Sequence, residues 1–102
     1  MKTLAEFKRE IKVGSKVSVV NHIKEEELLG TVAKTKTNGF VYVVEDGREI
    51  HHVYEQVKNI KYENGKLLYL AYIKDGVKFP SPDFDDREIW LELELLEPKM
   101  KG

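Results

Sequence analysis

The stretch TVAKTKTNGFVYVVEDGREIHHVY, residues 31–54, places two turn dipeptides between runs of β-branched and aromatic residues. Asn38-Gly39 and Asp46-Gly47 favour tight hairpins because both dipeptides accept positive φ angles. The flanking runs TVAKTK, FVYVV and REIHHVY have the composition of short strands. Residues 31–54 therefore predict three antiparallel strands joined by two hairpin turns.

The N-terminal residues predict one helix over about residues 3–11. Thr3 and Glu6 form a capping box, in which a hydroxyl and a carboxylate satisfy free amides at a helix start. Apolar residues follow at helical spacing on one face: Leu4, Phe7 and Ile11. Gly14 ends this element.

The remaining segments predict more short strands with two more tight turns. KVSVV, residues 16–20, alternates as a half-buried strand does, and NHIKEEELLG, residues 21–30, is expected to be a polar loop. Further hairpin signals lie at Asn64-Gly65 and Asp75-Gly76. EQVKN is expected to form a helical turn, and VKFPSPDF, with its two prolines, a loop or an irregular edge.

The last strand, EIWLELELL over residues 88–96, predicts two faces of different character. Alternation assigns four residues to the core: Ile89, Leu91, Leu93 and Leu95. The other face receives Trp90, Glu92, Glu94 and Leu96. A tryptophan on a face with two glutamates is costly unless the chain or a partner covers it.

These elements predict a single α+β domain, mostly β, over residues 1–102. An N-terminal helix precedes a strongly bent antiparallel sheet or SH3-like small barrel. We expect the SH3-like core over residues 13–62 and additional strands, ending in an acidic one, over residues 66–97.

Composition narrows the classes of function. The formal net charge is −1 and there is no cysteine, which excludes disulfides, thiolate zinc sites and cysteine nucleophiles. Charge is uneven: residues 1–80 hold 14 basic and 11 acidic residues, and residues 81–102 hold 3 and 7. The sequence shows no long apolar run and no signal-peptide pattern, so we expect a cytoplasmic protein without a membrane span.

Two resemblances add to this interpretation. The Gly14-to-Val17 and Gly30-to-Val32 patterns resemble those of SH3-like barrels, over roughly half of the chain. The layout TLAEFKREIKVGSK…TNGF…DGRE is similar to small accessory proteins of Gram-positive phages and integrative elements. That resemblance implies a protein that acts on host or defence machinery, such as an anti-CRISPR inhibitor of a nuclease.

The leading functional hypothesis is a non-enzymatic protein-binding module with an acidic, Trp-anchored face. An aromatic anchor among charges is typical of an interaction hot spot, and carboxylates complement a basic surface on a host or defence protein. The residues expected to bind this partner are Trp90, Asp83, Asp85, Asp86, Glu88, Glu92 and Glu94. Alternatively, this face is the interface of a homo-oligomeric structural subunit.

A second hypothesis is a nucleic-acid-binding barrel. Cations interleaved with aromatics can hold phosphates and stack on bases. The candidate residues are Lys34, Lys36, Phe40, Tyr42, Arg48 and Tyr54. Alternatively, the aromatics belong to the core and the lysines keep a strand edge solvated.

No cofactor, metal site or catalytic residue is expected. Adjacent strand residues point to opposite faces, so His51 and His52 cannot both join His22 as ligands, and one of the pair should face inward. The sequence lacks a nucleophile motif and a glycine-rich phosphate loop, and we therefore expect no enzymatic activity.

Overall fold

The structure, a computed structural model, describes residues 3–79 and 87–96. These residues form one helix, one 3-10 turn and eight strands, so the predicted α+β, mostly β class is confirmed. The elements are α1 (Leu4–Glu10), β1 (Lys16–Asn21), β2 (Glu26–Lys36), β3 (Gly39–Val44), β4 (Glu49–Val53), η1 (Val57–Asn59), β5 (Ile60–Glu63), β6 (Lys66–Lys74), β7 (Val77–Phe79) and β8 (Glu88–Leu96).

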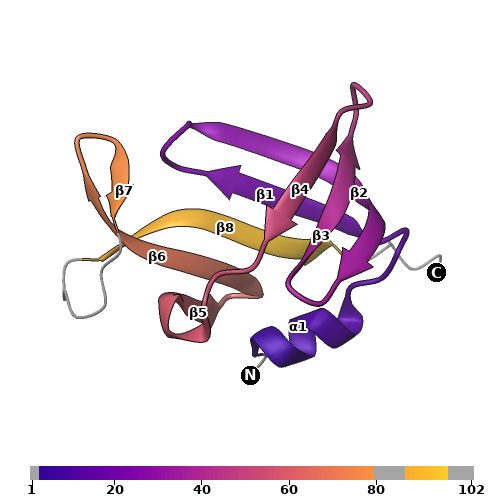
Figure 1. Ribbon diagram of the computed structural model, residues 1–102, viewed down its shortest axis with the longest axis horizontal. Helices are drawn as coiled ribbons and strands as arrows, with labels where there is room; N and C mark the ends of the chain where they lie inside the picture. The colour runs from indigo at the N-terminus through magenta and orange to yellow at the C-terminus, as the bar shows by residue number, and fades with distance from the viewer. Residues whose placement is uncertain (1–2, 80–86, 97–102) are drawn as a thin grey trace.

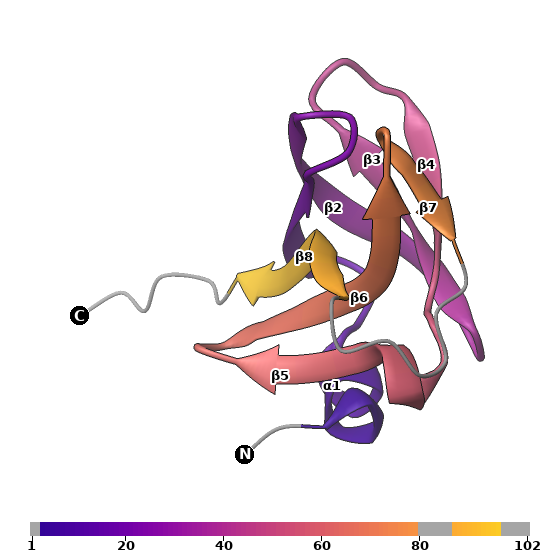
Figure 2. The ribbon, with the colours of Figure 1, turned by 90° about the vertical axis from the view of Figure 1, so that its left-hand side faces the viewer.

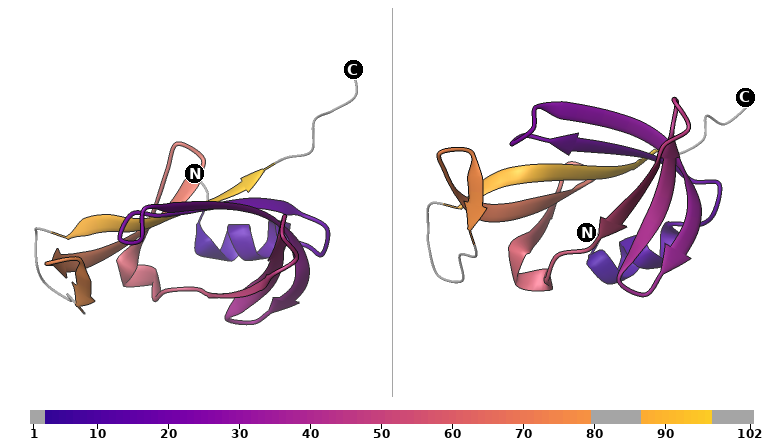
Figure 3. Two further views of the ribbon diagram at one scale, coloured as in Figure 1. Left: turned by 90° about the horizontal axis from the view of Figure 1, so that it is seen from above. Right: turned by 45° about the horizontal axis from the view of Figure 1, so that its top comes forward.

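The strands form one antiparallel sheet that bends into an open half-barrel (Figure 1). Its order is β4-β3-β2-β1-β8-β6-β5, with β7 paired to β6 at one end. β8 therefore lies in the middle of the sheet, between β1 and β6. Seen from above, the segment that joins β4 to β5 crosses the open side of the curved sheet (Figure 3).

Helix α1 lies at the end of the half-barrel opposite the β6–β7 hairpin (Figures 1 and 2). The Thr3 hydroxyl accepts a hydrogen bond from the Glu6 amide, as the predicted cap requires. Phe7 and Ile11, on the predicted apolar face, are buried in the core. The helix therefore closes one end of the concave side.

Two details of the predicted loops and turns were wrong. Residues 26–30 extend strand β2 instead of forming a polar loop, because they pair with β1 from Glu26 to Gly30. The Asn38-Gly39 turn forms, but without positive φ angles, which occur at the Asn64-Gly65 and Asp75-Gly76 turns. Gly39 is required for another reason: a Cβ there would lie 2.0 Å from the carbonyl oxygen of His52.

The core occupies the concave side of the sheet. It combines inward residues of β1, β2, β3, β6 and β8 with Phe7 and Ile11 of the helix region. Phe40, Tyr42 and Tyr69 are the largest fully buried side chains. The core is therefore rich in aromatic residues that come from both halves of the chain.

A β-bulge breaks the expected alternation of β8. Tyr69 on β6 pairs with Leu91 and the next residue, Leu70, pairs with Ile89, so Trp90 is the extra residue. A bulge re-aims side chains locally. Ile89, expected in the core, is 37% exposed, while Trp90 packs against the core cluster.

No helix within residues 3–79 and 87–96 is long and apolar enough to cross a membrane.

Candidate functional site

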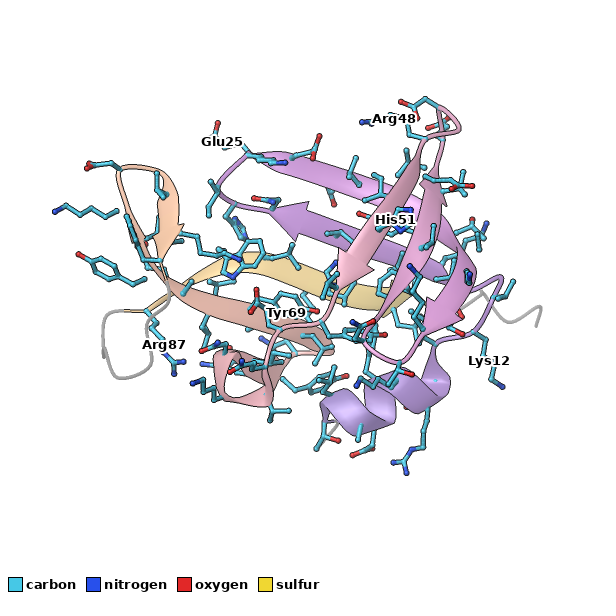
Figure 4. The ribbon with its side chains drawn as sticks, in the orientation of Figure 1. Lys12, Glu25, Arg48, His51, Tyr69 and Arg87 are labelled. Atoms are coloured by element: carbon cyan, nitrogen blue, oxygen red, sulfur yellow. The ribbon has the colours of Figure 1, made fainter. Side chains whose placement is uncertain are left out.

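The bulge places Trp90 on the concave side of the sheet. Its ring meets that of Tyr69 edge-on, with the centroids 5.9 Å apart, and its side chain is half-buried. Tyr69 is fully buried in the core and lies near the middle of the concave side (Figure 4). Trp90 is thus covered on one side by the chain itself.

A lysine ammonium also contacts the Trp90 ring. The ammonium of Lys78, on β7, lies 3.9 Å from the ring centroid, close enough for a cation–π interaction. The same ammonium lies 3.2 Å from Oε2 of Glu55, in the segment between β4 and η1. Trp90, Lys78 and Glu55 come from three separate elements, and we call them the ammonium site.

The indole nitrogen of Trp90 adds a free donor to this site. Nε1 is buried and finds no hydrogen-bond partner among the described residues. A buried donor without a partner costs about 1–3 kcal/mol.

The concave side also holds a cluster of aromatic rings next to the ammonium site. His52 lies among the rings of Phe40, Tyr54 and Tyr69, at 4.9, 6.0 and 5.5 Å between centroids. A hydrogen bond of 2.7 Å joins His52 Nε2 and the Tyr69 hydroxyl. Burial lowers the pKa of His52 to about 4, so the imidazole is neutral near pH 7. Burial likewise raises the pKa of the Tyr69 phenol, which stays protonated.

The predicted acidic face is divided. Glu92 lies on the convex side, where its carboxylate contacts His22 at 2.5 Å and Lys66 at 3.2 Å. The hydrogen bond from His22, followed by the Lys66 contacts, lowers the pKa of Glu92. Glu88 is exposed and Glu94 is half-buried opposite Ser18.

The three aspartates predicted to join this face, Asp83, Asp85 and Asp86, lie outside the described residues. Within the described part of β8, the side chains of Trp90 and Glu92 lie on different sides of the sheet. The expected arrangement, a tryptophan surrounded by free carboxylates on one face, is therefore not what β8 presents.

The candidate nucleic-acid residues do not form one surface. Lys34 and Lys36 are exposed, but Phe40 and Tyr42 are only 1% and 2% exposed and cannot stack on bases. The side chain of Arg48 is bound to Asp46 at 2.8 Å. The ring of Tyr54 is half-buried and has the Lys8 ammonium 5.2 Å from its centroid.

The histidines are arranged as the alternation predicts. His51 is exposed and His52 faces the core, while His22 is bound to Glu92. Among the described residues, no group of three or more potential ligands is placed to hold a metal ion.

Comparisons with known proteins give no relative for this chain. No family model, no curated protein and no solved structure matches it.

Sequence reasoning missed two of the three members of the ammonium site. Lys78 could have been found, because the Asp75-Gly76 turn places it opposite Ile73 in a hairpin. Glu55 carries no such signal, since it lies in an irregular segment whose course depends on the whole sheet. The bulge at Trp90 also cannot be predicted from the alternation of apolar and polar residues in β8.

Proposed function

We propose that this protein is a non-enzymatic protein-binding module whose ammonium site receives a cationic side chain from a basic surface of its partner. The observation that carries the proposal is the Lys78 ammonium between the Trp90 ring and the Glu55 carboxylate. An aromatic ring and a carboxylate that hold one cation have the chemistry to hold another.

Trp90 has the properties of an anchor residue. Tryptophan is enriched among residues that dominate binding energy, and the Trp90 side chain is only half-buried, so part of it can contact a partner. Glu55 supplies the negative charge, with its side chain 28% exposed. Among the described acids, Glu55 is the one paired with the lysine on the Trp90 ring, while the Glu92 carboxylate is held by His22 and Lys66.

The origin of the partner stays a prediction. The similarity to phage and mobile-element proteins favours a host or defence protein, such as a CRISPR nuclease, with a basic surface. The exposed Glu88 at the start of β8 can add to charge complementarity at the rim of such an interface.

The test is affinity capture from nuclease-treated lysate of the encoding organism's host, followed by binding measurements with the purified partner. We compare wild type with Trp90→Leu and Glu55→Lys, and use Glu45→Lys, an exposed acid outside the ammonium site, as the matched control. We expect Trp90→Leu and Glu55→Lys each to weaken binding by about 30-fold or more, the loss typical of a hot spot. Circular dichroism checks that each variant remains folded. A partner that binds folded Trp90→Leu and Glu55→Lys as tightly as wild type would refute the proposal.

A further inference from the structure

The geometry points to a specific ligand for the ammonium site: the side-chain ammonium of a lysine, plain or methylated, that enters by displacing Lys78. This inference rests on the proposed function and deepens it, because it names the group that the partner presents. Strand β7 then acts as an internal competitor, with Lys78 in the place of the partner's lysine.

The contacts of Lys78 define the chemistry that fits. Its Nζ lies 3.9 Å from the Trp90 ring centroid and 3.2 Å from a carboxylate oxygen of Glu55. A π face and a carboxylate around one small cation select a positive charge and discriminate against a neutral chain of equal length. The occupant that the structure shows is itself a lysine, which fixes the reach and the charge of the ligand.

The element that carries Lys78 is weakly attached. Among the described strands, β7 pairs with β6 alone, from Lys74–Val77 to Tyr72–Phe79. All three residues of β7 are exposed. Val77 and Phe79 are 52% and 43% exposed, so they contribute little burial. In Figures 1 and 3 the β6–β7 hairpin projects from the end of the half-barrel away from helix α1. A displaced Lys78 can therefore leave without disturbing the core.

The receiving groups are more firmly held. Trp90 packs on the fully buried Tyr69 and belongs to β8, which is paired on both sides. Arg87, just before β8, donates to the Lys58 carbonyl and to Asn59 Oδ1, which ties β8 to the segment that carries Glu55. Trp90 and Glu55 are therefore held in place to bind a cation, and Lys78 is the group that a ligand would displace.

The experiment uses the full chain and the variant Lys78→Ala. The probes are the Nα-acetyl methylamides of lysine and of trimethyllysine, with the norleucine derivative as the uncharged probe. Trp90 is the only tryptophan, so its fluorescence and its single indole N–H signal in NMR report on this site alone. We expect saturable changes with both lysine probes and none with norleucine.

Competition from Lys78 predicts that wild type binds the probes more weakly than Lys78→Ala does. Because Lys78 is tethered close to Trp90, it lowers the apparent affinity for the added probe. We expect the probes to half-saturate Lys78→Ala at a concentration about tenfold lower than wild type, from the usual strength of a partly desolvated cation–π contact. Lys74→Ala, on the same hairpin, is the matched control and should bind as wild type does.

Three results would overturn the inference. One is no saturable change in folded Lys78→Ala; another is equal binding of the norleucine probe. The third is unchanged lysine binding when Glu55→Gln is added to Lys78→Ala, because the carboxylate would then have no part in the site.

The two proposals fail separately. If the lysine probes bind Lys78→Ala but no captured partner depends on Trp90, the ammonium site stands and the protein-binding function falls. If a partner depends on Trp90 while the lysine probes do not bind, the binding function stands and the lysine ligand is wrong.

Discussion

Strand β8 holds a cation on each of its two faces, in two different ways. On the convex face, the Glu92 carboxylate contacts both His22 and Lys66, which belong to the neighbouring sheet region. On the concave face, Trp90 and Glu55 together contact one lysine, which comes from the short and exposed strand β7. On the convex face the carboxylate contacts two groups of the sheet region, whereas on the concave face the cation comes from an exposed strand at the end of the sheet.

The difference shows that the number of acids in a stretch of sequence does not tell which carboxylates already have partners within the fold. The acid-rich sequence around β8 predicts that Glu92 and Glu94 bind a partner. The Glu92 carboxylate, however, contacts His22 and Lys66 of the same chain. Within residues 3–79 and 87–96, the concave face pairs the Glu55 carboxylate with Lys78 and leaves the Trp90 indole donor without a hydrogen-bond partner. Incomplete satisfaction of polar groups distinguishes the two faces better than the number of acids does.

The largest expected effect comes from His52, which is buried on the concave side. Its low pKa predicts that the free energy of unfolding decreases in mild acid. The pKa of His52 is about 4 in the folded chain, against 6.5 for an ordinary histidine. Between these values the unfolded chain binds a proton that the folded one excludes, so stability is complete above pH 6.5 and falls as the pH drops towards 4. The loss should reach about 2–3 kcal/mol, measured by urea unfolding at a series of pH values.

Two variants separate His52 from other titrating groups. His52→Phe should remove most of this pH dependence, whatever its effect on stability at pH 7. His51→Gln, which changes the exposed neighbour, should keep it. If His52→Phe still loses stability as wild type does between pH 6.5 and 4, the interior imidazole is not the group responsible.

A smaller effect is expected from the convex network. The lowered pKa of Glu92 means that its carboxylate stabilises the fold above its ordinary pKa of 4.5, and that this contribution disappears as the pH falls through the lower folded value. Glu92→Gln should cost about 0.5–1 kcal/mol at pH 7, because the pair is partly exposed to water, and the cost should decrease in high salt. Chemical denaturation at low and high ionic strength measures it, with Glu94→Gln as control. A salt-independent cost would show that packing, not charge, is lost.

The smallest effect on stability is expected from Lys78→Ala on the concave face. The Lys78 side chain is 40% exposed, so its loss should lower the free energy of unfolding by less than about 1 kcal/mol. Hydrogen exchange of the β7 amides should nevertheless accelerate, since the Lys78 side chain joins β7 to Trp90 of β8 and to Glu55. A stability loss above that of Glu92→Gln would contradict the view that the concave occupant is the exchangeable one.

Local patterns in the sequence were sufficient for most of the fold. The Thr3 helix cap, the Asn64-Gly65 turn and the strand at residues 16–20 depend on neighbours in the sequence, and each formed as expected, although Ser18 of that strand is buried. The expectation failed at residues 26–30, where charged residues pair as a strand because β1 supplies a partner along its whole length. Tertiary pairing outweighed local polarity there.

The candidate site was less predictable because it depends on register between distant strands. The sequence predicts that Trp90 contacts a partner, but the direction of its side chain is set by a bulge opposite Tyr69, which no periodicity in residues 88–96 reveals. Phe40 and Tyr42 were candidates for base stacking, and the curvature of β3 buries both. Which side of a curled sheet an aromatic faces is decided by the partner strands.

The central position of β8 also has a consequence for the order in which the molecule can fold. Lys16, at the start of β1, pairs with Leu96, so the last described strand must join the first before either half of the sheet is complete. Pairing across such a separation closes a long loop and is slow to nucleate. The hairpins β2–β3 and β6–β7 can form early, but a chain that has not yet added β8 leaves β1 and β6 without their shared neighbour. Folding is therefore expected to be concerted and limited by the arrival of β8, the same strand that carries Trp90.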